Sequence, residues 1–258
     1  MNFSIIINTH NQSKFIYECI KSCENQTFSD HEIIVVDTSK KALKKKYKIS
    51  KRVKYFHIKE KSKSFPVLNQ MHQILYGLKK SKGKFICLLD GDDKFKKSKL
   101  KKLSIFFKKN QYILNQDIPI IFTGRSKYLE KIKSIKNNFF FKNLFINWPQ
   151  VFGTSTITCN REILELFFKV AKPFRWKYLA IDAKIMLFAR YKFGIKNEFH
   201  GITFKRKHNK NLDKTFSNFF SIFFWKRRKM QFDYNHFLTK RRIINFDYVV
   251  TNLINFFL

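Results

Sequence analysis

The chain has 258 residues, 44% of them hydrophobic, which is enough to bury the core of a single α/β domain and excludes a disordered chain. Its 53 Lys and Arg residues exceed its 18 Asp and Glu residues and give a formal net charge of +35, so we expect an anionic surface or ligand as a partner. The N-terminal residues show no basic leader with a cleavage site, and their apolar run is too short to span a bilayer. The four cysteines follow neither a zinc-binding nor a disulfide pattern, which favours a reducing, cytoplasmic location; they are Cys19, Cys23, Cys87 and Cys159.

The start of the chain predicts a strand, a helix and a second strand. Ser4–Ile7 is apolar and β-branched, and it leads into the polar residues 8–11. Apolar residues then recur at helical spacing from Phe15 to Cys23, so the two cysteines in this stretch are better explained as core residues than as reactive ones. A second buried strand, Ile33–Val36, ends at Asp37. Together these elements predict a βαβ unit.

The next segments continue the alternation of strands and helices. The basic segment Lys40–Arg52 is expected to be a helix and its exit, followed by a strand at Val53–Ile58. Pro66 can begin a helix whose apolar face extends to Leu78, and a buried strand at Phe85–Leu89 follows it. Strands that alternate with helices predict a mostly parallel sheet with right-handed crossovers. A further helical face lies between Leu100 and Phe107, and a further strand at residues 118–123.

Three acids follow the strand Phe85–Leu89 and surround one glycine. The carboxyl ends of parallel strands form the edge at which open α/β sheets bind ligands. Asp90 and Asp92 would place two carboxylates on a sharp turn at this edge, which suits Mg²⁺ or Mn²⁺ and a phosphorylated ligand. The alternative is a solvated acidic turn, because turns often contain Asp.

The order of these segments resembles the nucleotide-binding half of the family 2 glycosyltransferases, which have the GT-A fold. The resemblance rests on Ser4-Ile-Ile-Ile-Asn-Thr-His-Asn11, Asn25-Gln-Thr-Phe28, Glu32-Ile-Ile-Val-Val-Asp37 and Lys82-Gly-Lys-Phe-Ile-Cys-Leu-Leu-Asp-Gly-Asp-Asp93. It implies an α/β, Rossmann-like fold with a mostly parallel sheet flanked by helices. It also implies roles in binding the nucleotide sugar for several residues, with Asp92 holding the metal on the diphosphate; those residues are Thr9, Asp37, Asn69 and Asp90.

The resemblance extends into the second half of the chain. Phe152–Leu164 is similar to the acceptor-side strand and helix of that family, and Trp176–Ala189 is similar to a helix with an acid in its first turn. By its position Asp182 matches the catalytic acid of the family. The alternative is a purely structural role, because an acid at a helix N-terminus favours the helix dipole.

A basic and aromatic segment, Phe204–Asn211, resembles the family segment that ends in a histidine. The resemblance implies that His208 binds the metal or the diphosphate, and that Lys205 and Arg206 contact phosphate. For all three residues the alternative is a solvated surface.

Five positions depart from the family pattern. Their residues are Asn8 in place of Pro, His10 in place of Tyr, Thr38 in place of a second Asp, Leu68 in place of Arg, and Ile181 in place of Glu. These changes affect nucleotide binding more than catalysis, so the sequence does not identify the nucleotide-sugar donor.

The C-terminal part changes in character. Aromatic residues precede the cluster Lys226–Lys229, and residues 249–258 are apolar again. This combination is typical of a segment lying on anionic lipid, although a helix packed on the core explains it equally well. The aromatic stretch 138–145 presents the same alternatives.

The sequence therefore predicts a GT-A domain at 1–209, with a nucleotide-binding half at 1–125 and an acceptor half at 126–209, and a helical, aromatic and basic extension at 210–258. We expect a metal-dependent inverting glycosyltransferase, with Mn²⁺ or Mg²⁺ as cofactor, that moves a sugar from a nucleoside diphosphate to a glycan or lipid-linked acceptor in bacterial surface polysaccharide synthesis. It would be cytoplasmic, with a peripheral contact through 216–229 at the inner membrane face and no specific nucleic acid partner. The alternatives are a non-catalytic basic protein that binds nucleic acid or anionic membrane, and a nucleotidyl transfer enzyme, for which the sequence lacks a Gly-rich, Lys-containing loop.

Overall fold

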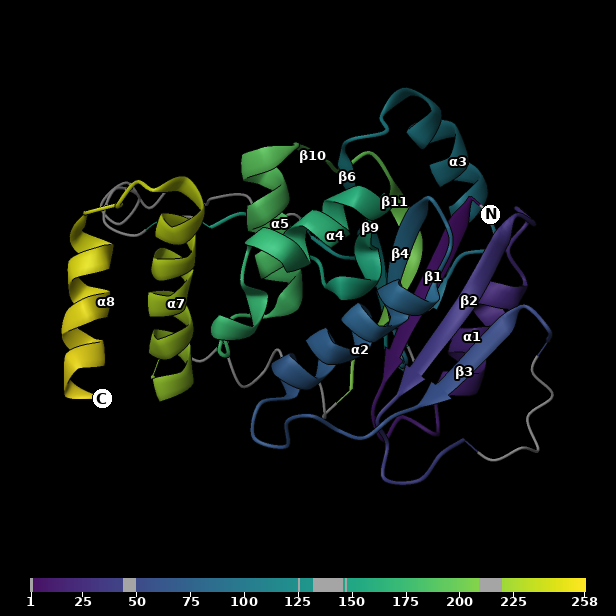
Figure 1. The fold of residues 1–258 in the computed structure, drawn as a ribbon, viewed down its shortest axis with the longest axis horizontal. Coiled ribbons are helices and arrows are strands. Elements are labelled where there is room, and N and C mark those ends of the chain that lie inside the picture. The colour runs from purple at the N-terminus through teal and green to yellow at the C-terminus, as the bar shows by residue number, and fades with distance from the viewer. Residues whose placement is uncertain (1, 44–49, 125, 132–145, 147, 209–219) are drawn as a thin grey trace.

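The computed structural model describes residues 2–43, 50–124, 126–131, 146, 148–208 and 220–258 (Figure 1). Its centre is a seven-stranded sheet with the order β10-β6-β9-β4-β1-β2-β3. The strands β1, β2, β3 and β4 are parallel, whereas β9 runs antiparallel to β4 and β6. Their bounds are β1 (Phe3–Thr9), β2 (His31–Asp37), β3 (Val53–His57), β4 (Phe85–Asp90), β6 (Leu114–Gln116), β9 (Ile157–Asn160) and β10 (Ile195–Lys196).

Helices cover both faces of this sheet. The face that carries Ile5 and Ile7 packs against α1 (Ile16–Glu24) and α3 (Lys99–Lys109). Ile6, on the opposite face, belongs to a second core formed with α2 (Pro66–Lys80), α4 (Arg161–Val170) and α5 (Ile181–Lys192). Successive residues of a strand point to opposite faces, so an unbroken apolar strand supplies both cores.

A smaller, four-stranded sheet lies against the carboxyl side of the main sheet. Its order is β5-β11-β7-β8, with β11 parallel to β7 and antiparallel to β5. The bounds are β5 (Lys94–Phe95), β7 (Ile118–Phe122), β8 (Lys127–Leu129) and β11 (His200–Arg206). Because β5 follows the acids of β4 and pairs with β11, this sheet brings the basic end of β11 to the acidic turn.

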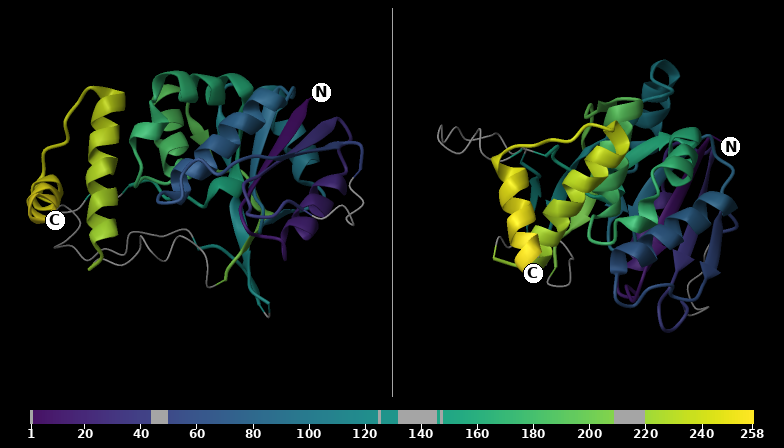
Figure 2. Two further views of the ribbon diagram at one scale, coloured as in Figure 1. Left: turned by 60° about the horizontal axis from the view of Figure 1, so that its bottom comes forward. Right: turned by 60° about the vertical axis from the view of Figure 1, so that its left-hand side comes forward.

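The chain ends in two helices that lie to one side of the sheet (Figures 1 and 2). The helix α7 (Ile222–Thr239) packs on α5 and its preceding segment, where Trp176 contacts the rings of Tyr234 and Phe237. The last helix, α8 (Phe246–Phe257), packs on α7. Among the described residues, none of the helices is both long and apolar enough to span a membrane.

The predicted fold class is confirmed, and the main strands and helices lie where the sequence indicates. The helix expected at 40–52 is wrong for the part of it that can be described, since residues 40–43 and 50–52 are not helical and include a bend at 40–41 and a turn at 51–52. The strand expected at 118–123 exists as β7 but belongs to the smaller sheet, and β11 is a strand that the sequence analysis did not identify. Residues 138–145 and 216–219, which carried predictions, lie outside the described residues.

Candidate active site

Three strands of the main sheet end together at one edge and bring polar side chains to it. In the strand register Asn8 lies beside Asp90 of β4, and Thr9 lies beside Asp37 of β2. The close approach of this edge to the acidic turn requires Gly91, because a Cβ there would lie 2.6 Å from Thr9 Oγ1. The glycine therefore allows the β4 turn to pack directly on the end of β1.

Asp90 is held by two side-chain amides. Asn8 Nδ2 and Gln70 Nε2 each donate a hydrogen bond of 2.8 Å to Asp90 Oδ1. Burial and the negative charge of Asp92 raise the pKa of Asp90 to about 7, and the carboxylate of Asp182 adds to this increase while Lys205 opposes it. Asp182 and Lys205 are therefore close enough to act on Asp90 electrostatically.

Asp92 lies beside His208, the histidine predicted to bind the metal or the diphosphate. His208 Nε2 lies 2.8 Å from Asp92 Oδ2, and the imidazole stacks on the ring of Phe15 at a centroid distance of 5.4 Å. The backbone carbonyl of Asp92 accepts a hydrogen bond of 2.9 Å from Arg206 Nε. The structure thus brings together the acidic turn after β4 and the segment after β11.

The third acid of the turn has internal partners. Asp93 is 4% exposed, and its carboxylate accepts hydrogen bonds from Ser155 Oγ at 2.6 Å and from the Arg206 backbone amide at 2.7 Å. Burial and the charges of Asp92 and Asp90 raise the pKa of Asp93 well above its usual range. Asp93 therefore fixes the turn to its neighbours and does not face a ligand.

The acid after β2 is also buried. Asp37 accepts hydrogen bonds from Ser39 N at 2.7 Å and from Tyr55 Oη at 2.6 Å, and burial followed by the bond to Asp37 raises the pKa of Tyr55. Thr9, beside it, is 3% exposed and donates to Gln12 Oε1 at 3.1 Å. Each oxygen of Asp37 keeps a second lone pair that can accept a hydrogen bond from a ligand.

Asn69 forms a hydrogen-bond network with Thr38 and His10, two residues that depart from the family pattern. Asn69 Nδ2 donates to Thr38 Oγ1 at 2.8 Å, and the Nδ1 of His10 lies 3.1 Å from the same oxygen. Asn69 Oδ1 accepts a hydrogen bond of 3.2 Å from the backbone of Lys61. Thr38, at a position where the resemblance leads one to expect Asp, joins the loop after β1 to the start of α2.

Asp182 lies in the first turn of α5, as the sequence predicts. Its Oδ1 accepts a hydrogen bond of 2.8 Å from the following backbone amide, of Ala183. Two residues on, Lys184 is fully buried and donates to Pro173 O at 3.0 Å. Burial lowers the pKa of Lys184 to about 7, and the charge of Asp182 partly offsets this decrease.

The two basic residues predicted to contact phosphate differ in their surroundings. Lys205 Nζ lies near Gly153, where an added Cβ would be 3.1 Å from it, and its charge acts on Asp90. The guanidinium of Arg206 binds Glu18 and lies over the ring of Phe15, 4.5 Å from the centroid. Lys205 is therefore better placed than Arg206 to meet a phosphate at the acidic edge.

The candidate residues for a small divalent cation are Asp92 and His208. Among the described residues there is no group of three or more His, Cys, Asp and Glu side chains that could hold a metal ion. The two candidate ligand atoms are 2.8 Å apart; two ligands at right angles on an ion with bonds of about 2.1 Å are about 3 Å apart. Mg²⁺ and Mn²⁺ often take few protein ligands and complete their shell with water and phosphate oxygens. This donor set therefore suits an ion that binds together with a diphosphate.

Sequence reasoning missed two residues that build the site. Gln70 bonds both Asp90 and Thr154 Oγ1, the latter at 3.3 Å, and Ser155 Oγ accepts from the Asp90 backbone amide at 3.0 Å while donating to Asp93. Gln70 follows Asn69 at the start of α2, where polar residues interrupt the apolar face. That interruption was the available signal.

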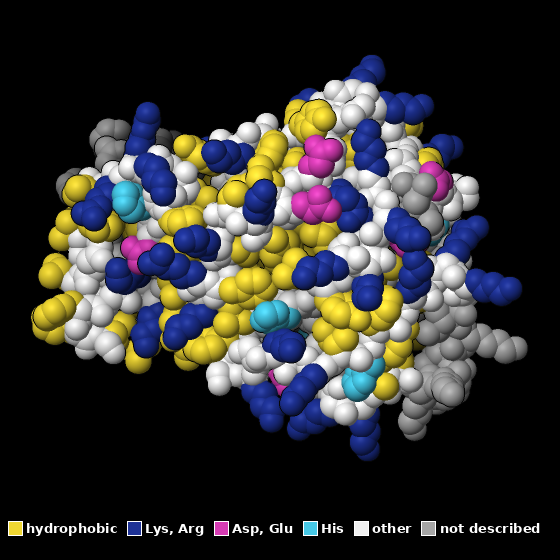
Figure 3. Space-filling view, viewed as in Figure 1, with side chains coloured by type: hydrophobic (Ala, Val, Ile, Leu, Met, Phe, Trp, Pro, Cys, Tyr) yellow, Lys and Arg dark blue, Asp and Glu magenta, His cyan; other side chains and the backbone are white. Residues whose placement is uncertain are grey.

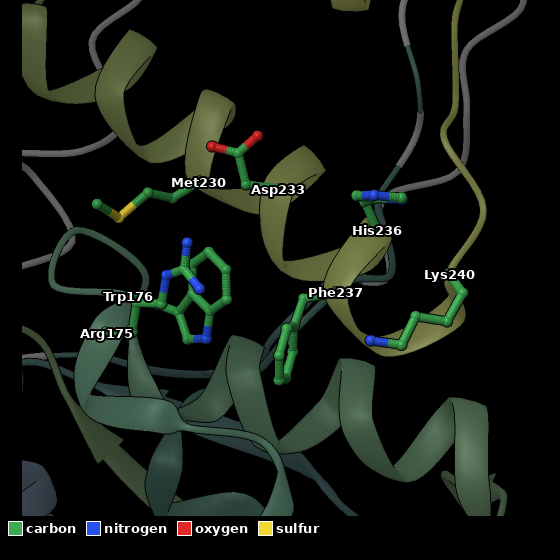
Figure 4. Close-up of a pocket in the computed structure, with 7 residues that line it drawn as sticks. All are labelled: Arg175, Trp176, Met230, Asp233, His236, Phe237 and Lys240. Carbon is green, nitrogen blue, oxygen red and sulfur yellow. The ribbon is translucent and has the colours of Figure 1, made fainter.

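A cavity of about 520 Å³ lies elsewhere, between α7 and the segment before α5 (Figure 4). It is lined by Arg175, Trp176, Met230, Asp233, His236, Phe237 and Lys240. None of the acids of the sheet edge lines it, so we do not assign the nucleotide to this cavity.

The mostly parallel sheet, with acids at its carboxyl edge and a smaller sheet beside it, defines an α/β protein of the GT-A class. The chain is similar in fold to Staphylococcus aureus TarS residues 1–349, solved in complex with UDP-GlcNAc, with a TM-score of 0.62 and 16% identity over 98% of this chain and 70% of that chain. The model of glycosyl transferase family 2 matches residues 4–167. The chain therefore belongs to glycosyl transferase family 2.

Curated relatives agree with this assignment. The chain is 30% identical over 166 residues to an uncharacterized glycosyltransferase of Rickettsia felis, a match that covers 60% of this chain and 26% of the relative. It is 35% identical over 95 residues, covering 35% of this chain and 29% of the relative, to the GalNAc(5)-diNAcBac-PP-undecaprenol beta-1,3-glucosyltransferase of Campylobacter jejuni. It is 26% identical over 128 residues, covering 48% of this chain and 46% of the relative, to a putative teichuronic acid biosynthesis glycosyltransferase of Bacillus subtilis. The matched segment thus spans about a quarter of the Rickettsia relative.

Proposed function

We propose that the chain is a metal-dependent inverting glycosyltransferase that moves a sugar from a nucleoside diphosphate to a hydroxyl of a glycan or lipid-linked acceptor. The main support is that the charges of Asp92, just after β4, and of Asp182, at the start of α5, both raise the pKa of Asp90 at the end of β4. The relatives named in polysaccharide synthesis support a bacterial surface glycan as the product.

The residues of the edge divide into two groups. Thr9, Asp37 and Asp90, at the carboxyl ends of β1, β2 and β4, would bind the nucleoside through hydrogen bonds, together with Asn69 in the first part of α2. Asp92 and His208 would hold Mn²⁺ or Mg²⁺, which when bound offsets the charge of the diphosphate. Lys205, whose charge already acts at this edge, would add a second positive charge beside the leaving group.

Asp182 would act as the general base. The acceptor oxygen would attack the anomeric carbon on the face opposite the diphosphate while its proton passes to the Asp182 carboxylate. The bond between the anomeric carbon and the phosphate oxygen would break, and the diphosphate would leave with the electron pair. One displacement of this kind inverts the anomeric centre and requires no nucleophile from the protein.

The experiment compares three variants in a panel of nucleotide sugars, beginning with UDP-linked ones, with Mn²⁺ or with a chelator. Asp182→Asn should retain the thermal shift caused by the donor and lose transfer by about 100-fold or more, since a general base contributes about 10² to 10⁴. Asp92→Ala should lose both the Mn²⁺-dependent shift and turnover. Asp233→Asn, at a carboxylate on α7 that is 42% exposed, is the control and should behave as the unmodified chain.

Two outcomes would reject parts of the proposal. Full transfer activity of Asp182→Asn would show that Asp182 is not the general base. Full activity of Asp92→Ala in excess chelator would show that the reaction needs no metal ion at Asp92. If no nucleotide sugar shifted the melting temperature while nucleic acid bound with a steep salt dependence, the non-catalytic alternative would replace the enzyme.

A peripheral contact of residues 216–229 with the inner membrane face remains part of the proposal. Its described portion offers Phe220, which is 91% exposed, together with the basic residues of α7. Trp225, by contrast, is 6% exposed and packs inside.

A further inference from the structure

The polar face of α8 is turned toward the protein. Asp247 and Thr251 are both 0% exposed, and Asn255 donates a hydrogen bond of 3.0 Å to the backbone carbonyl of Trp225 on α7. These three residues are spaced by four, so they lie on one side of the helix. A helix on the surface of a water-soluble protein normally buries its apolar side.

An ion pair fixes this orientation. Arg228 on α7 donates from Nε to Asp247 Oδ1 at 2.6 Å and from Nη2 to Asp247 Oδ2 at 2.5 Å. The same carboxylate accepts from the backbone amide of Ile146 at 3.0 Å and from Thr251 Oγ1 at 3.3 Å. A two-pronged arginine–carboxylate contact is directional, so rotating α8 would break the three hydrogen bonds that a buried charge accepts from Arg228 and Ile146.

The opposite side of α8 is apolar and exposed. Val249 is 47% exposed, Leu253 55%, Phe256 83% and Phe257 82%. Their spacing places them along the side of the helix away from α7. In Figure 3 hydrophobic side chains gather along the left-hand edge of the molecule, over α8, with Lys and Arg side chains beside them.

The charge around α8 favours an anionic partner. Asp247 is the single charged residue in α8 and is neutralised by Arg228, whereas the connection from α7 carries the exposed residues Lys240, Arg241 and Arg242. With 12 residues α8 is about 18 Å long, which is short of the roughly 20 apolar residues needed to cross a bilayer. An apolar helix face flanked by cations is suited to lie in the plane of an anionic membrane surface.

We propose that the outward face of α8 inserts into the headgroup region of an anionic lipid bilayer, with Arg241 and Arg242 contacting lipid phosphates. This surface differs from the segment 216–229, and it does not depend on the proposed reaction. It would hold the enzyme at a lipid surface through α8 while α7, packed on α5, connects this surface to the catalytic edge.

The first test uses a fluorescent label on α8. All four native cysteines are buried, so a thiol-reactive, environment-sensitive dye will mark an introduced surface cysteine selectively. Val249→Cys should show a blue shift with vesicles of phosphatidylglycerol and phosphatidylcholine and little change with phosphatidylcholine alone. Ile105→Cys, at a residue of α3 that is 61% exposed, is the matched control and should show no shift.

The second test compares two doubly substituted variants of equal charge. Leu253→Asp with Phe257→Asp should weaken binding to the anionic vesicles by about tenfold or more, because two apolar side chains leave the interface. Ile105→Asp with Tyr112→Asp, at positions 61% and 58% exposed, changes the net charge equally and should weaken binding far less. Donor hydrolysis should be the same in both variants.

Three results would overturn the proposal. They are an equal loss of vesicle binding in the two doubly substituted variants, an unshifted label at Val249→Cys on anionic vesicles, and a mass by light scattering that falls from dimer to monomer only in the α8 variant. The last result would assign the α8 face to a second copy of the chain. Failure of donor hydrolysis alone would affect only the proposed reaction.

Discussion

The pKa of the Asp90 carboxyl group is subject to opposing effects. Burial and the charge of Asp92 disfavour its ionised form, while the hydrogen bond from Asn8 favours it. Asn8 replaces the proline that the family resemblance leads one to expect, and a proline could not donate this bond. Asn8 therefore adds to the acidic turn a side-chain hydrogen bond that a proline at this position could not make.

Lys184 leads to a prediction about pH and stability. Its pKa is about 7 in the folded chain, against an ordinary value of 10.5, because burial disfavours the ammonium form. Between these values the unfolded chain binds more protons, so stability should rise with pH over this window, by about 2 kcal/mol from pH 7 to pH 9. Well below pH 7 both the folded and the unfolded chain bind this proton, so the contribution no longer changes.

The measurement is urea unfolding of the unmodified chain and of Lys184→Met at pH 7 and pH 9. Lys184→Met keeps a long unbranched side chain and should lose the pH-dependent gain. Lys192→Met removes an exposed lysine of the same helix and should retain it. An equal gain in all three proteins would show that Lys184 remains charged when buried.

At the scale of elements, the contact between α2 and β1 is close enough to predict a stability change. A Cβ on Gly77 would lie 2.5 Å from Cγ2 of Ile6, which is itself fully buried. Alanine is the better helix former, yet overpacking a core costs about 1 to 3 kcal/mol. We therefore expect Gly77→Ala to lower the free energy of unfolding.

A double-mutant cycle with Ile6→Ala separates packing from helix propensity. If the clash with Ile6 causes the loss, Gly77→Ala should cost clearly less, or even stabilise, in the Ile6→Ala background. The measurement is denaturant unfolding of the four proteins. A cost that is the same in both backgrounds would assign the effect to some other contact of α2.

Elements whose pattern is local could be predicted from the sequence. The strand at Phe3–Thr9 and the helix at Pro66–Lys80 each carry their own periodicity and boundary residues, and both lie where expected. The strand β11 is different, because it exists through pairing with β7 and β5, far away in the sequence. The orientation of α8 likewise depends on the pair of Arg228 with Asp247, which no periodicity reveals.

In the candidate site, too, some residues could be predicted from the sequence and others could not. The acids Asp37, Asp90, Asp92 and Asp182 could be named because they follow strands or begin a helix in a familiar order. Gln70 and Ser155 could not, since their importance comes from hydrogen bonds made across the fold. Residues that hold an acid in place carry a weaker sequence signal than the acid itself.

At the scale of the whole molecule, the excess of positive charge exceeds what internal ion pairs can neutralise. With 53 basic and 18 acidic residues, pairing every acid with one base would leave 35 bases without an acidic partner. Some acids are also shared between two bases, as Glu18 is between Lys94 and Arg206. Mutual repulsion among the remaining cations opposes the compact state.

Added salt should therefore stabilise the chain, contrary to what is expected when surface ion pairs dominate. Raising NaCl from 10 mM to 150 mM shortens the screening distance from about 30 Å to about 8 Å, so repulsion between separated cations weakens. The melting temperature should rise by several degrees, as measured by circular dichroism without ligand. NaCl and Na₂SO₄ at equal ionic strength distinguish two causes: equal shifts indicate screening, whereas a larger shift with sulfate indicates a bound anion. A melting temperature that falls with both salts would mean that attractive pairs outweigh the repulsion of the uncompensated cations.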